Sequence, residues 1–177
     1  AEEWQPRAVR LADMDGDGLV DVVVDEIDRD EMGFSILRNN GGWSFGLEFH
    51  GPRGPYMADL AARDLDADGD LDVARLHLGA GEISVALNDG GKWRDPSLTS
   101  TGLGSQKLCV ANVGGDMLPD LFAVGVDGVW IHRGAGGGRF EAPPEVVISS
   151  GEISSATATD IDADGDDDLI VGRGVDE

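Results

Sequence analysis

The sequence predicts an all-β fold, a β-propeller built from four-stranded blades. An acidic pattern of nine residues recurs along the chain, and its copies begin at residues 13, 64, 112 and 160. A step of about fifty residues is typical of propeller blades. The 27 glycines favour many short strands and tight turns over helices.

Each acidic copy has β-like segments on both sides. Small residues dominate the segment before it, as in LAAR and ATAT, whereas the segment after it is a run of apolar or β-branched residues, as in VVV and LIVG. We therefore expect each copy to be the turn of a hairpin. Small side chains in the leading strand suit an inner position, where neighbouring blades crowd together.

A second landmark moves in register with the first. It reads NNGGWSF at 39–45, NDGGKW at 88–93 and RGAGGGRF at 133–140. Each copy predicts a strand, a glycine-rich turn and a further strand, which completes four strands per repeat. Because Trp43, Trp93 and Phe140 keep one place in the repeat, we expect them to pack between blades.

The boundaries of the repeat follow from these landmarks. We expect one domain over 1–177, with blades at 7–56, 57–104 and 105–152 and half a blade at 153–177. This gives about three and a half blades per chain. Three outcomes stay open for the exposed edges: a fragment of a longer chain, a four-bladed ring closed by the N-terminal strand, or a homodimer that completes a seven-bladed ring. The homodimer is the first choice.

The net charge of the chain limits the classes of partner that it can bind. Its 35 acidic and 13 basic residues give a net charge of −22, which disfavours nucleic acid and anionic membrane surfaces. The acids gather in short clusters, and clustered carboxylates repel one another unless a cation lies among them. A solvated acidic surface is the alternative, but it needs no fixed spacing.

The acidic copies read D-x-D-x-D-G-x-x-D, a pattern suited to a hard cation. Calcium takes six to eight oxygen ligands, and alternate side chains of a tight loop can surround one point. A glycine at position six allows the sharp turn, and a backbone carbonyl at position seven can add an oxygen. The predicted ligands are Asp13, Asp15, Asp17, Leu19 and Asp21; Asp64, Asp66, Asp68, Asp70 and Asp72; and Asp160, Asp162, Asp164, Asp166 and Asp168.

Other metals and other loops fit less well. An EF-hand needs a glutamate at position twelve and helices on both sides, but position twelve is Val24, Arg75 or Val171. Magnesium usually keeps several waters, and transition metals ask for His or Cys, which these loops lack. We therefore expect about three Ca²⁺ ions per chain.

The acidic pattern resembles the FG-GAP or VCBS-type repeat, the calcium-loop blade of integrin α-subunit propellers. In that family the aspartates of D-x-D-x-D-G-x-x-D bind calcium in the hairpin between the first two strands of a blade, so the resemblance implies the same role for the aspartates above. The copy at Asn112–Asp120 departs from the pattern: Asn112, Gly114 and Met117 replace two aspartates and the glycine. We expect weak calcium binding there, or none.

The resemblance implies a secreted or cell-surface module for adhesion to a protein or glycan. We expect no enzyme, since the chain has no HExxH, G-x-S-x-G or P-loop motif. An accessory domain of a secreted carbohydrate-active enzyme and a self-assembling structural half-propeller are the alternatives. The sequence does not name the ligand.

Overall fold

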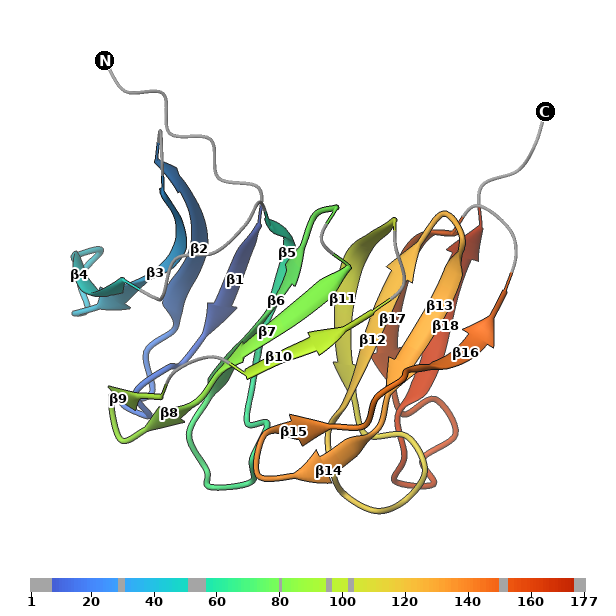
Figure 1. Cartoon of the computed structure of the whole chain (residues 1–177). Coiled ribbons are helices and arrows are strands. Elements are labelled where there is room, and N and C mark those ends of the chain that lie inside the picture. The colour runs from blue at the N-terminus through green and yellow to red at the C-terminus, as the bar shows by residue number, and fades with distance from the viewer. Residues whose placement is uncertain are drawn as a thin grey trace.

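The computed structural model describes residues 8–28, 31–50, 57–79, 81–94, 97–101, 104–149 and 153–173. None of these residues is helical, which confirms the predicted all-β class. The strands form several antiparallel sheets that follow one another along the chain (Figure 1). None of the described elements is a helix long and apolar enough to cross a membrane.

Three of the sheets have four strands each. The first has the order β1-β2-β3-β4, the second β10-β7-β6-β5 and the third β11-β12-β13-β16, and a two-stranded sheet pairs β17 with β18. The strands of the first sheet are β1 (Val9–Ala12), β2 (Asp21–Asp28), β3 (Glu31–Asn39) and β4 (Phe45–His50). Those of the second are β5 (Met57–Arg63), β6 (Asp72–His77), β7 (Glu82–Ala86) and β10 (Ser97–Ser100). Those of the third are β11 (Ser105–Ala111), β12 (Asp120–Gly125), β13 (Gly128–His132) and β16 (Glu145–Ile148), and the last pair is β17 (Ile153–Thr159) and β18 (Asp168–Arg173).

The acidic loops occupy equivalent places in the four sheets. Each joins the two strands that open its sheet, namely β1 to β2, β5 to β6, β11 to β12 and β17 to β18, and each pair is antiparallel. The last paired residues of each hairpin lie directly beside the loop, as Ala12 opposite Asp21 and Thr159 opposite Asp168. The hairpins predicted around the acidic copies are therefore confirmed.

The glycine-rich landmark follows the prediction fully in the first sheet only. There β3 runs through the turn into β4. In the other two sheets the landmark forms short separate ribbons, β8 (Asn88–Asp89) with β9 (Lys92–Trp93) and β14 (Gly134–Gly136) with β15 (Arg139–Phe140), and the outer strand comes later. A proline lacks the N–H that a ladder needs, and Pro96 or Pro143 and Pro144 separate ribbon from outer strand in the sequence.

The core lies between successive sheets. One cluster joins the first two sheets through residues such as Phe34 and Leu60, and a second joins the next two through Leu76 and Leu121. The third cluster packs Phe122 and its neighbours against the β17–β18 pair. Because β6 and β12 are buried along their whole length, they lie in the middle of this layering. The apolar run 121–124 of β12 suits that place, whereas β6 also buries Asp72, Arg75 and His77.

The aromatic residues of the landmark differ in their surroundings. Trp93 packs against the first core cluster and meets the ring of Phe34 edge to face at 5.6 Å, and Phe140 packs against the second cluster. Trp43, in contrast, is 96% exposed, so its predicted place between blades is wrong. Its turn sits between β3 and β4 of the first sheet, where the landmark runs directly into the outer strand and no ribbon folds it back.

Candidate metal centre

The loops owe their tight curl to left-handed backbone positions. Gly18, Gly69 and Gly165, at position six of the three full copies, have φ values of 86°, 98° and 99°. These values lie in the region that glycine enters without steric cost. In the third loop Met117 takes this position with φ of 61° and an exposed side chain, so the loop keeps its shape at a cost in strain.

The first aspartate of each full copy receives the loop's own amide groups. Asp13 accepts hydrogen bonds from the N–H groups of Asp17 and Gly18 at 3.1 and 2.9 Å. Asp64 accepts from Ala67 and Gly69, and Asp160 accepts from Ala163 and Gly165 in the same way. The chain therefore wraps around the carboxylate at position one.

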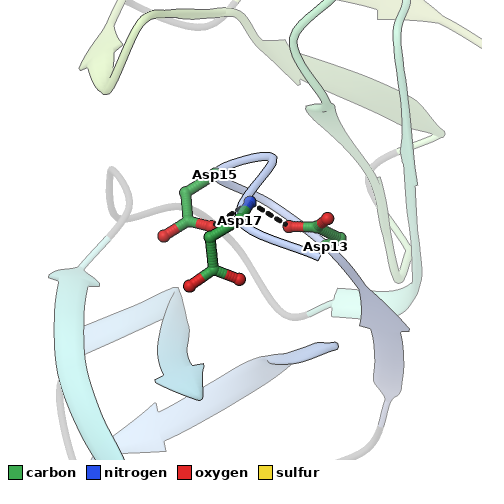
Figure 2. Close-up of side chains that lie close together, drawn as sticks. All are labelled: Asp13, Asp15 and Asp17. Atoms are coloured by element: carbon green, nitrogen blue, oxygen red, sulfur yellow. Dashed lines mark hydrogen bonds between the residues drawn. The ribbon is translucent and has the colours of Figure 1, made fainter. Parts of the chain in front are cut away.

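Three carboxylates converge in each full copy. One oxygen from each member of a cluster lies within 4.8 Å of the others (Figure 2 shows the first cluster). Calcium binds oxygens at about 2.3 to 2.6 Å, so two ligands on opposite sides of an ion are about 4.6 to 5.2 Å apart, and this donor set fits the ion. The clusters are Asp13, Asp15 and Asp17; Asp64, Asp66 and Asp72; and Asp160, Asp162 and Asp168.

The other predicted ligands have different surroundings. Asp68 and Asp164 each accept a hydrogen bond from the amide two residues on. The side chain of Asp70 accepts from the N–H of Gly90 at 2.7 Å, which links the second loop to the glycine-rich turn. The backbone carbonyls at position seven, those of Leu19, Asp70 and Asp166, stay predicted ligands.

The aspartate at position nine has a second role that the sequence pattern did not reveal. Asp21, Asp72 and Asp120 are at most 1% exposed. One oxygen of Asp72 accepts from the N–H of Leu65 at position two, at 2.7 Å, and the other accepts from Asn88 beyond β7, at 2.8 Å. Asp21 and Asp120 make the same two kinds of bond. We call this aspartate the clasp, because it ties the loop to the end of the third strand.

The electrostatics of the second loop favour a cation. The pKa of Asp72 is raised to about 6, mainly by burial and to a smaller extent by the carboxylates of Asp66 and Asp68, while its two backbone hydrogen bonds act in the opposite direction. Burial, followed by the charge of Asp68, also raises the pKa of Asp66. A divalent ion between these groups would stabilise their ionised forms.

Arginines lie close to the first three aspartates in two of the full copies. Arg38 forms an ion pair with Asp15, and Arg94 lies 3.6 Å from Asp66 and 3.9 Å from Asp68. Both guanidinium groups are well exposed, so each offsets part of the loop's charge without closing it. Over the described ranges no Lys or Arg forms an ion pair with the first three aspartates of the fourth loop.

In the third loop an arginine of the chain itself supplies positive charge. The Nη1 atom of Arg133 donates to the carbonyl of Val113 at 2.6 Å and lies 3.6 Å from the clasp, Asp120. A Cβ added at Gly114 would come within 3.3 Å of the same nitrogen, so an aspartate at position three would crowd the guanidinium. The loop that has lost two aspartates and its glycine therefore has a cation from its own chain.

The third and fourth loops touch. The N–H of Asn112 donates to the carboxylate of Asp167 at 2.9 Å, and the N–H of Asp167 donates to the carbonyl of Asn112 at 2.7 Å. Arg63 lies 3.7 Å from Asp167 as well. These contacts join the loop of the β17–β18 pair to the neighbouring sheet.

Comparison with known proteins identifies the repeat. The model of the FG-GAP-like repeat family matches residues 13–75 and 112–171, which is more than half of the chain and includes all four acidic loops. The crystal structure of the biofilm matrix protein Bap1 from V. cholerae has a similar fold, with a TM-score of 0.52 and 17% sequence identity. The match covers 97% of this chain but only 32% of that chain. None of the curated proteins compared matches.

Proposed function

Because the chain belongs to the FG-GAP-like repeat family, we propose that it is a calcium-binding β-propeller module whose work is binding rather than catalysis. The observation that carries the proposal is the convergence of three carboxylate oxygens within 4.8 Å in each of three loops, at one equivalent place in their sheets. Calcium would supply the positive charge that lets these carboxylates stay ionised side by side. The loops' own amide groups preshape the cage.

Three ions per chain follow from this proposal. The first, second and fourth loops would each hold one ion, whereas Arg133 fills the corresponding role in the third. The packing of each sheet against the next supports our proposal of about three and a half propeller blades.

The setting we propose is extracellular. These loops lack the bidentate glutamate of tight calcium sensors, and extracellular modules with weak sites bind at about 10⁻⁴ to 10⁻³ M. Such sites fill only where calcium is millimolar, which is the case outside cells. The similar fold of a biofilm matrix protein suits that setting.

Metal stoichiometry tests the proposal directly. Isothermal titration of the chelator-treated chain with calcium should give three sites, and Asp162→Asn should leave two. Asp116→Asn is the matched control, because Asp116 has the same residue type in the arginine-filled loop. The control should keep three sites. The proposal fails when millimolar calcium leaves no bound ion and no gain in melting temperature.

Binding and catalysis are separated by a second measurement. Arrays of glycans and proteins, probed in calcium and then in chelator, should give retention of some ligand. If the chain turns over polysaccharide substrates and retains no ligand on the arrays, it is an enzyme and not a binding module.

A further inference from the structure

A cavity of about 360 Å³ opens along the strands that begin the four sheets. Its walls come from β1, β5, β11 and β17, the four strands that lead into the acidic loops (Figure 1). The volume lies in the range of small-molecule sites, about 300 to 1,000 Å³, and suits one or two sugar units. Alanines such as Ala61 and Ala156 line it, and their small side chains leave the space open.

The charge of this cavity is opposite to that of the protein. Three cationic side chains line it, Arg10, Arg63 and Lys107, in a chain with only 13 basic residues and a net charge of −22. Within the described part of the lining the one acid is Asp59, whose side chain is 4% exposed. Such a local reversal attracts anions to a surface that otherwise repels them.

The buried carboxylate fixes one of the cations in place. Asp59 accepts a hydrogen bond from Nη2 of Arg10 at 2.6 Å, and its other oxygen accepts from the N–H of Leu108 at 3.1 Å. It therefore ties β5 to both neighbouring strands. The Nη1 atom of Arg10 donates to the carbonyl of Val9 at 2.9 Å.

These contacts hold the guanidinium at the cavity while leaving donors for a ligand. A guanidinium has five N–H groups, and the contacts with Asp59 and Val9 use two. A cation held rigid before binding loses little conformational entropy when a carboxylate arrives. Lys107 lies on β11, which neighbours β5, and its side chain is exposed. It can therefore contact the same ligand as Arg10 with a second positive charge.

We propose that this cavity binds a carboxylate-bearing sugar, a uronic acid unit of an acidic glycan. The polar and cationic lining favours a charged ligand, and among the residues that the structure describes it contains no aromatic ring on which a neutral sugar could stack. The cavity is also too small for a folded peptide surface. The inference rests on the proposed role as a binding module and names the class of its ligand, but it does not depend on the calcium loops.

The test uses the whole chain at fixed calcium and a set of short probes. Trigalacturonate should bind, whereas galactotriose should bind at least tenfold more weakly, and the affinity should fall as sodium chloride rises. Lys107→Gln should weaken trigalacturonate binding about fivefold or more. Lys92→Gln is the matched control, because Lys92 is the other lysine of the chain, is exposed and lies on β9 away from the cavity. It should change the affinity less than twofold.

Several results would overturn the inference. Equal affinity for the neutral trisaccharide, equal effects of the two lysine variants, or no binding of trigalacturonate would each do so, and tighter binding of hexaglutamate would reassign the cavity to an acidic peptide. Calcium stoichiometry is measured on the same samples. If the chain binds three calcium ions but no uronate, this inference alone is wrong. If it binds uronate but no calcium ion, only the metal assignment is wrong.

Discussion

The clasp at position nine allows a sharp prediction, and the third loop is the place to test it. In Asp120→Ala the N–H groups of Val113 and Gly134 lose their acceptor, which they now contact at 3.1 and 2.8 Å. A buried donor left without a partner costs about 1 to 3 kcal/mol. Both hydrogen bonds are only partly buried, so the loss of the two should lower the free energy of unfolding by about 2 kcal/mol, near the lower end of this range for each donor.

Asp116→Ala is the comparison in the same loop. Asp116 is exposed and accepts one local hydrogen bond, from the N–H of Leu118. Its loss should cost less than about 1 kcal/mol. The assay is urea unfolding followed by circular dichroism, in calcium and in chelator.

The effect of Asp120→Ala should be equal in the two buffers, since Arg133 rather than an ion serves this loop. The clasp reasoning is refuted when the two variants destabilise the protein equally. It is also refuted when chelator abolishes the difference between them.

The remaining predictions concern the cations and one buried base. Arg133→Met should destabilise the protein by about 1 to 3 kcal/mol in urea unfolding, with or without calcium, because it removes a hydrogen bond to Val113 and the charge beside buried Asp120. Burial lowers the pKa of His132 below its ordinary 6.5, so the unfolded chain takes up the proton first and stability falls as the pH drops below about 6.5; urea unfolding at several pH values should show a smaller fall for His132→Asn. Chelator should speed amide exchange more in β17–β18 than in β11–β12, because the described ion pairs place no arginine on Asp160, Asp162 or Asp164, whereas Arg133 lies beside the third loop; equal acceleration in mass spectrometry would contradict this.

Much of the repeat architecture could be predicted from the sequence. The acidic pattern marks a turn through chemistry that is local: alternating aspartates and a glycine define both the curl and its oxygen atoms. Its even recurrence then places the turns at equivalent points of successive sheets. The hairpins and the three carboxylate clusters follow from these short-range facts.

Other features depend on contacts that residue order alone does not reveal. The clasp bonds join residues that are far apart in the sequence, such as Asp72 and Asn88. The sequence pattern does not show these bonds, and it therefore predicts only a metal ligand at position nine. The exposure of Trp43 also depends on tertiary contacts, so the sequence pattern did not predict it. The sequence signal that separates it from Trp93 and Phe140 is a proline three residues on, Pro96 or Pro143, since no proline follows Trp43 before Pro52.

The third loop shows why losing metal ligands need not break a repeat. Its clasp keeps both backbone partners, and its third strand still ends beside the loop. What the carboxylates of the other loops require is positive charge, and a guanidinium at 2.6 Å from the Val113 carbonyl supplies it with no loss of sheet register. The clasp therefore holds the hairpin to its sheet, and under the proposed function calcium would order the tips of the other three loops. For this reason chelation should loosen three loop tips before it separates the sheets.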